Sequence, residues 1–209
     1  MEHLASRVWE DEAIAGTTEM RAAPRFTLLI RAARLVTPKG EFVCVIRDAS
    51  ETGVSVRLFH AMPDCSEIEL HMPGGESYEI RPVWARGNEA GFEFARPIEV
   101  ARLINEAGEY PKRGLRLGVG FPVDIFTLTQ SCTAQIENFS QQGARIVCDF
   151  PLAIDQSLRI VSSFDAKDVR AKVRWRRGSH YGVVFDDTFT LGDFARFAAK
   201  LQAPELLDD

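Results

Sequence analysis

The sequence predicts an all-β protein with two six-stranded antiparallel β-barrels in tandem, each followed by a C-terminal helix. Three observations support this fold class. Short runs rich in β-branched and aromatic residues alternate with turn residues from Phe26 onward. The same order of runs occurs twice, and several residues are identical at corresponding places in the two halves. The length of 209 residues leaves room for two small domains.

The first half of the chain contains six strand-like runs and one helical pattern. Turn sequences such as Pro73-Gly74-Gly75 separate the runs. We predict strands at 26–36, 42–47, 54–59, 67–72, 78–86 and 91–94. Apolar residues then recur at helical spacing over 97–107, with Pro97 in the first turn and Gly108 as a stop, which predicts a helix.

The second half repeats this order of elements. We predict strands at 119–129, 131–137, 144–150, 158–162, 169–176 and 181–185. A closing helix is predicted over 191–201, because Phe194, Phe197, Ala198 and Leu201 share one helical face.

Residue identities show that the two halves are copies of one unit. Residues 84–94 and 175–185 both match Trp-x-Arg-Gly-x-x-x-Gly-x-x-Phe, at an offset of 91. Residues 48–53 and 138–143 share a Ser-x-x-Gly turn at an offset of 90. Two shared patterns at nearly one offset indicate duplication. We therefore expect a flexible N-terminal tail at 1–19, a first barrel at 20–107 and a second barrel at 108–209, with the boundary near 108–111.

Composition excludes several classes of protein. The net charge of −5 and pI near 5.5 argue against a DNA- or RNA-binding protein, which carries a basic surplus. The four cysteines form no Cys-x-x-Cys and have no histidine at metal-ligand spacing, so reduced thiols without a metal are expected. No secretory signal and no apolar run of about 20 residues is visible. A cytoplasmic location without a membrane span is the expectation.

Two short motifs stand on either side of the first predicted hairpin. Arg21 and Arg25 lie four residues apart, just before the first strand. Asp48, Ser50 and Gly53 form an Asp-x-Ser-x-x-Gly turn after the second strand. Pro24 favours an extended chain at the residue before it, so the arginines should project from an irregular segment. Gly53 is expected to hold a positive φ or to allow a ligand close to the backbone.

This pair of motifs resembles the binding motif of the PilZ family, small β-barrels that sense cyclic di-GMP. The resemblance implies that Arg21 and Arg25 clasp phosphate and guanine, that Asp48 and Ser50 contact the second guanine, and that Gly53 shapes the turn. Arginine suits this ligand, because a guanidinium binds phosphate bidentately, reads guanine O6 and N7, and stacks on a base. No cofactor is implied.

The second barrel carries a degenerate version of the motif. Its turn residues are Asn138, Ser140 and Gly143, and the family tolerates Asn at the first position. The arginine pair is replaced by Lys112-x-x-x-Arg116 or by Arg113-x-x-Arg116. Losing one guanidinium fork costs a few kcal/mol, roughly two decades in affinity. We expect a weaker second site at most, with the barrel serving as a dimerisation or partner-contact module or lending residues to the first site.

Other distinctive residues are interpreted as packing or surface. Trp84 and Trp175 occupy matching places and are predicted to pack in the core or at the rim rather than to stack on a ligand. Lys172, Arg174 and Arg176 alternate on one strand and predict a basic face, either solvated or facing an acidic partner. Arg31 and Arg34 are each equally consistent with the first pocket and with the surface.

The expected function is a cyclic di-GMP receptor without catalysis, which changes conformation on binding and signals to an unidentified protein partner. The alternative is a structural or adaptor protein whose barrels bind a protein partner, with nucleotide sensing lost or secondary. An enzyme is disfavoured, because four scattered histidines and unclustered carboxylates provide neither a metal cage nor a nucleophile–base pair. Homodimerisation is left open.

Overall fold

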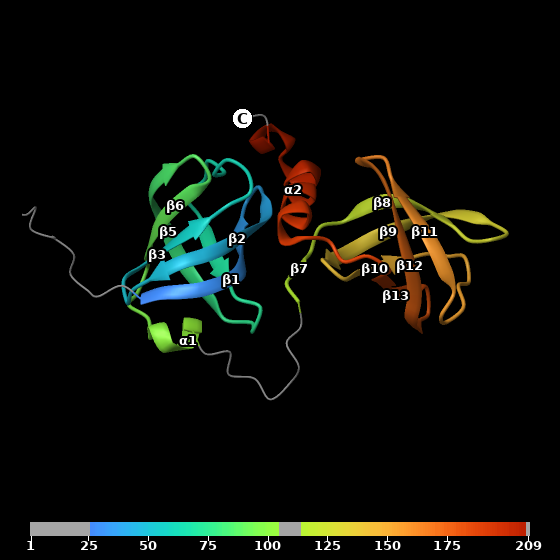
Figure 1. Cartoon of the computed structure of the whole chain (residues 1–209), viewed down its shortest axis with the longest axis horizontal. Helices are drawn as coiled ribbons and strands as arrows, with labels where there is room; N and C mark the ends of the chain where they lie inside the picture. Colours follow the sequence, from blue (N-terminus) through green and yellow to red (C-terminus); the bar gives the residue numbers. More distant parts are fainter. Residues whose placement is uncertain (1–25, 105–113, 208–209) are drawn as a thin grey trace, which may run out of the picture.

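The computed structural model describes residues 26–104 and 114–207, which form two β-barrels side by side (Figure 1). The first barrel contains β1 (Phe26–Thr37), β2 (Gly40–Ala49), β3 (Gly53–Arg57), β4 (Ile68–His71), β5 (Ser77–Arg86) and β6 (Glu89–Phe94). All neighbours are antiparallel, and the barrel closes in the order β1-β2-β3-β6-β5-β4. The predicted strands and closed barrel are confirmed here.

The second barrel repeats the topology of the first. It contains β8 (Phe121–Phe126), β9 (Ser131–Ser140), β10 (Gly143–Val147), β11 (Ser157–Ser162), β12 (Asp165–Arg177) and β13 (His180–Phe185). The ring runs β10-β13-β12-β11-β8-β9 and closes through the pairing of β9 with β10. A short strand that the sequence did not predict, β7 (Arg116–Leu117), adds to β9 ahead of the ring.

The prediction of a helix after each barrel is wrong for the first. In the described part of the chain, α1 (Val100–Ile104) has five residues, and α2 (Leu191–Gln202) is the one substantial helix. Ile98 does not join α1, because its backbone N–H donates to Glu51 O at 2.9 Å and so holds this part of the chain against the β2–β3 turn. Residues 105–107 of the predicted helix lie outside the described residues.

Helix α2 lies between the two barrels and packs on both (Figure 1). Its N-cap is Thr190, whose Oγ1 accepts a hydrogen bond from Asp193 N at 3.1 Å. Phe194 belongs to the core of the second barrel. Farther along, Ala199 and Ala203 form a small buried cluster with Phe42 of β2. A 3₁₀ turn, η1 (Pro204–Leu207), continues this contact with the first barrel.

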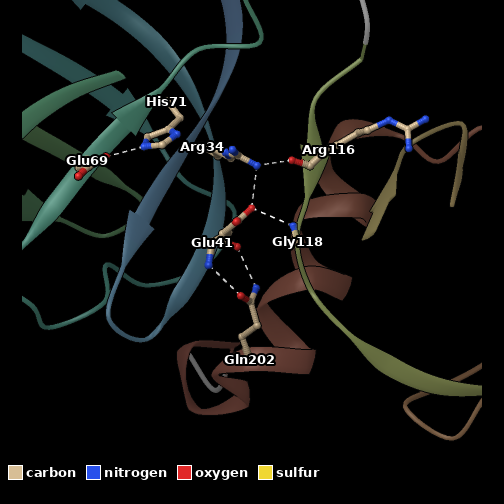
Figure 2. A network of polar contacts seen from close by, with 7 residues as sticks. All are labelled: Arg34, Glu41, Glu69, His71, Arg116, Gly118 and Gln202. Atoms are coloured by element: carbon tan, nitrogen blue, oxygen red, sulfur yellow. Dashed lines mark hydrogen bonds and ion pairs between the residues drawn. The ribbon is translucent and has the colours of Figure 1, made fainter. Parts of the chain in front are cut away.

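A polar network joins β1 and β2 to the second barrel (Figure 2). Glu41 accepts hydrogen bonds from Arg34 Nη1 at 2.9 Å and from Gly118 N at 3.0 Å. Arg34 Nη1 also donates to the backbone oxygen of Arg116 at 2.6 Å. The side-chain amide of Gln202 bonds the backbone N–H and C=O of Glu41 at 2.7 and 2.8 Å. We call these residues, Arg34, Glu41, Arg116, Gly118 and Gln202, the inter-barrel network.

The four cysteines are free thiols, with Cys44 and Cys148 buried. No helix in residues 26–104 or 114–207 is long and apolar enough to cross a membrane. Across the same two ranges, no group of three or more His, Cys, Asp or Glu side chains is placed to hold a metal ion.

Candidate functional site

The motif turn of the first barrel is built by its own serine and glycine. Ser50 is 6% exposed, and its Oγ accepts from Gly53 N at 3.1 Å while its backbone N–H donates to Gly53 O at 2.8 Å. Asp48, beside this turn, accepts a hydrogen bond from Ser55 Oγ at 2.5 Å. Arg21 and Arg25 lie outside the described residues, so the structure describes the turn of the first site and not its arginine pair.

Gly53 has a packing role beside the two predicted ones, a positive φ and close approach of a ligand, of which the second stays a prediction. It is not among the described glycines that hold a positive φ. A Cβ at this position would lie 2.9 Å from the backbone oxygen of Phe92. The glycine therefore lets β6 approach β3 closely, and the expectation of a positive φ is wrong.

The second barrel forms the same turn with tighter packing. Ser140 Oγ donates to Gly143 O at 3.1 Å, and a Cβ on Gly143 would lie 2.2 Å from Val183 O. Asn138 Oδ1 accepts a hydrogen bond from Arg116 Nη1 at 3.0 Å. The turn that the motif specifies is thus built in both barrels, although its first residue is Asp48 in one and Asn138 in the other.

Strand register identifies Arg116 as the counterpart of Arg25. Phe26 pairs with Ala49, and Leu117 pairs with Phe139, which is the residue equivalent to Ala49 at the offset of 90. Leu117 therefore corresponds to Phe26, and the residue before each is an arginine. This register favours Lys112-x-x-x-Arg116 as the remnant of the arginine pair, with Lys112 itself outside the described residues.

A large cavity opens at the second-barrel motif. Its volume is about 1120 Å³, above the roughly 300–1,000 Å³ of typical small-molecule sites. Four of the predicted second-site residues line it, namely Arg116, Asn138, Ser140 and Gly143. Arg34 and Glu41 reach it from the first barrel, so the cavity lies where the two barrels meet. The prediction left Arg34 open between pocket and surface; its place is in this cavity and in the inter-barrel network.

The cavity wall is strongly cationic. Five arginines line it, against one carboxylate, Glu41, which gives a formal charge of 5 − 1 = +4 with His180 neutral; the arginines are Arg34, Arg116, Arg145, Arg174 and Arg177. Arg145 pairs with Glu137 at 2.6 Å and Arg174 with Asp155 at 3.2 Å, both outside the lining. No ion pair is found for Arg177 within the described ranges. A protein with net charge −5 thus concentrates positive charge at one concave site.

Each of the two repeated tryptophans packs on a glycine, and one of them also faces the cavity. A Cβ on Gly91 would lie 2.0 Å from Trp84 Nε1, and a Cβ on Gly182 would lie 1.9 Å from Trp175 Nε1. Each indole therefore lies directly over a glycine of the next strand. Trp84 and Trp175 nevertheless remain 37% and 40% exposed, and Trp175 lines the cavity.

Comparison with known proteins identifies the family. The family described as the PilZ domain matches residues 19–107 and 112–201, the two halves recognised from the internal repeat. The chain belongs to the PilZ family. PilZ domains are non-catalytic receptor domains that bind cyclic di-GMP. None of the curated proteins matches this PilZ chain.

Several solved structures are similar to this tandem PilZ protein over most of its length. PlzA of Borreliella burgdorferi, in complex with c-di-GMP, is 11% identical, with 83% of this chain and 88% of that chain covered and a TM-score of 0.37. MrkH of K. pneumonia in its apo state is 11% identical over 84% and 86%, with a TM-score of 0.34. YcgR of Escherichia coli, in complex with c-di-GMP, is 10% identical over 84% and 86%, with a TM-score of 0.30.

Sequence reasoning missed most of the cationic wall. Arg145, Arg177 and His180 were not among the predicted site residues, and Arg174 was assigned to an outer basic face. The signal was present in the repeat. At the same offsets, Arg145 replaces Ser55, and Arg174 replaces Val83. An aligned comparison of the two halves finds both substitutions.

Proposed function

We propose that this PilZ protein is a cyclic di-GMP receptor without catalytic activity, which signals to a partner protein through a change in how its barrels associate. The observation that carries the proposal is the Asp48–Ser50–Gly53 turn of the first barrel, formed with partly buried hydrogen bonds and preceded in sequence by Arg21 and Arg25.

In this proposal, Arg21 and Arg25 hold phosphate and guanine, because each guanidinium offers a planar fork of donors. Asp48 accepts a guanine edge donor. Ser50, which the resemblance assigned to the second guanine, is engaged in the turn and nearly buried, so its first role is to position the turn. Gly53 keeps β3 close to β6.

Strand β2 connects the proposed site to the inter-barrel contact. Asp48 lies at one end of β2 and Glu41 at the other. Between them, Phe42 packs on α2, and Val43 belongs to the core cluster of the second barrel. A ligand that reorders the start of β1 and the end of β2 therefore acts on the strand that holds the barrels together.

Isothermal titration with cyclic di-GMP tests this proposal. Binding is expected for the intact chain and is expected to fall at least 100-fold in Arg21→Ala/Arg25→Ala. The matched control is Arg57→Ala/Arg81→Ala, two exposed arginines of β3 and β5. The absence of binding to the intact chain, or equal affinity after removal of Arg21 and Arg25, would contradict the proposal.

An adaptor protein without a nucleotide role is the second candidate. One observation favours it: Arg170 and Lys172 are exposed on β12, and within residues 26–104 and 114–207 neither forms an ion pair. Such a face suits an acidic protein surface. The two candidates differ in a pull-down, since only a receptor changes its partner affinity when cyclic di-GMP is added.

A further inference from the structure

The two barrels differ in charge at two equivalent positions of one wall. Register supports the equivalence, because Ser55 of β3 pairs with Gly91 and Arg145 of β10 pairs with Gly182. Arg145 thus stands where the first barrel has Ser55, and Arg174 stands where it has Val83. The second barrel has a weaker arginine pair ahead of its first strand and two extra arginines on its strands.

These arginines are held by paired strands of the barrel rather than by the segment that precedes it. Arg145 is in β10, between Asn138 on the neighbouring β9 and Gly182 on β13. A register shift between Val173 and Trp175 makes Arg174 the extra residue of a β-bulge in β12. Arg177 lies at the end of β12, opposite His180. All three residues line the cavity together with the motif turn.

The wall also offers a flat apolar surface. One face of the Trp175 indole covers Gly182, and the ring is 40% exposed at the cavity. An exposed indole stacks on nucleobases of any identity, and guanidinium groups bind phosphate oxygens bidentately. The cationic wall has a formal charge of +4 over its lining residues, and of 5 − 3 = +2 when Glu137 and Asp155, the partners of Arg145 and Arg174, are counted. Together with the stacking surface, it matches a ligand with both a base and phosphate.

We propose that the second-barrel cavity binds a phosphorylated nucleotide through Arg145, Arg174 and Arg177, with Trp175 stacking on its base. The strand arginines bind the phosphate in place of the degenerate arginine pair. The second barrel is then itself a nucleotide-binding domain and not only a contact module. The inference deepens the proposed function and rests on it only in taking a nucleotide as the ligand. A cyclic dinucleotide and a guanosine triphosphate provide the same chemistry, and the test separates them.

Tryptophan fluorescence isolates this cavity. The chain has three tryptophans, at positions 9, 84 and 175, so Trp9→Phe/Trp84→Phe leaves Trp175 as the reporter. Adding Arg21→Ala/Arg25→Ala removes the proposed first site. In this full-length background, cyclic di-GMP and GTP are titrated separately at about 150 mM salt. A saturable change in Trp175 emission with at least one of them is expected.

The decisive variant gives the second barrel the residues of the first. Arg145→Ser/Arg174→Val is expected to weaken the binding seen by Trp175 at least 10-fold. Arg170→Val is the matched control, because Arg170 is exposed on the same strand and does not line the cavity. Arg177→Ala is a second test variant. Because the Arg177 side chain forms no ion pair within the described residues, its removal should weaken nucleotide binding while the circular dichroism spectrum and Tm stay unchanged.

Two results would overturn the inference. One is the absence of a saturable Trp175 response to both nucleotides. The other is unchanged affinity in Arg145→Ser/Arg174→Val and Arg177→Ala, or equal weakening by Arg170→Val, which indicates a general charge effect. Failure of the first-barrel proposal is distinguishable by calorimetry in the Arg145→Ser/Arg174→Val background, where binding of cyclic di-GMP that does not depend on Arg21 and Arg25 contradicts the first site while the Trp175 result stands.

Discussion

Glu41 of the first barrel accepts a hydrogen bond from the backbone N–H of Gly118, 3.0 Å away in the segment that leads into the second barrel. The same carboxylate holds Arg34, which reaches the backbone oxygen of Arg116 (Figure 2). Arg116 in turn bonds Asn138 in the cavity. A short chain of hydrogen bonds thus runs from β2 to the motif turn of the second barrel.

Glu41→Gln should loosen the contact between the barrels. The amide keeps an oxygen for Gly118 but loses the charge that holds Arg34, and a charged hydrogen bond contributes about 1.5–3 kcal/mol. With Glu41 and Arg34 each about one-quarter exposed, we expect a loss of about 1–2 kcal/mol in unfolding free energy. Denaturant unfolding measures this loss. Glu69→Gln, whose partner His71 belongs to the same barrel, is the control and should change stability by less than about 0.5 kcal/mol.

The motif glycines should differ in their tolerance of alanine. A Cβ would lie 2.2 Å from Val183 O at position 143 but 2.9 Å from Phe92 O at position 53. Both neighbours are backbone atoms, so the strands must separate. Gly143→Ala should therefore cost about 3 kcal/mol and Gly53→Ala about 1 kcal/mol, the upper and lower ends for overpacking. Thermal unfolding gives the order. Gly114→Ala meets no atom within 4 Å and serves as a neutral control, and an inverted order would contradict the packing explanation.

Lowering the pH should reduce the folding stability of the protein through His60, which is buried beside α2 and η1. Its Nδ1 donates to Ala61 O at 2.7 Å, its ring lies 5.1 Å from that of Phe42, and Ala61 N donates to Leu206 O. Burial lowers the pKa of His60 below its usual value near 6.5. The unfolded chain therefore binds a proton before the folded one does, and stability is full above about pH 6.5 and falls as pH drops through the folded pKa.

The measurement for His60 is Tm as a function of pH from 8 to 5. The native protein should lose stability below about pH 6.5, and His60→Phe should flatten this part of the curve. His71→Asn is the control, because His71 is paired with Glu69 on the surface and should leave the slope in place. If Tm of His60→Phe still falls below about pH 6.5 as in the native protein, the acid sensitivity belongs to other groups.

Asp48→Asn should reduce ligand binding without unfolding the first barrel. The amide retains an oxygen for Ser55 Oγ, so the contact at 2.5 Å is replaced rather than lost. The negative charge that would accept a guanine donor is removed, and we expect about a 10-fold loss of cyclic di-GMP affinity by calorimetry. Ser55→Ala removes the hydrogen bond instead and should have the smaller effect on binding. An equal loss in both variants would indicate that Asp48 acts by shaping the turn.

The strands were predictable because their sequence signals are local. Alternation, turn residues and the repeated Trp-x-Arg-Gly pattern locate β5 and β6 in one half and β12 and β13 in the other. The helix after the first barrel was not predictable from its pattern. Val100 and Leu103 satisfy helical spacing, but a long-range hydrogen bond from Ile98 to Glu51 determines where the helix begins.

The candidate site was predictable as a motif and not as a surface. The Ser/Gly turns depend on contacts three residues apart, and both were found. The cavity depends on which strands meet across the barrel and between barrels, and its arginines come from β1, β7, β10 and β12. The placement of Arg34 in particular follows from the packing of one barrel on the other.

The side-chain amide of Gln202 occupies the place of a peptide group beside β2. It gives an acceptor to Glu41 N and a donor to Glu41 O, as a neighbouring strand does. Gly40 must lack a Cβ for this contact, since one would lie 2.2 Å from Gln202 Oε1. Gln202 leaves the ribosome 161 residues after Glu41. The first barrel is therefore made with one peptide unit unpaired, and its hydrogen bonding is completed only when the helix of the second barrel has been synthesised and has docked.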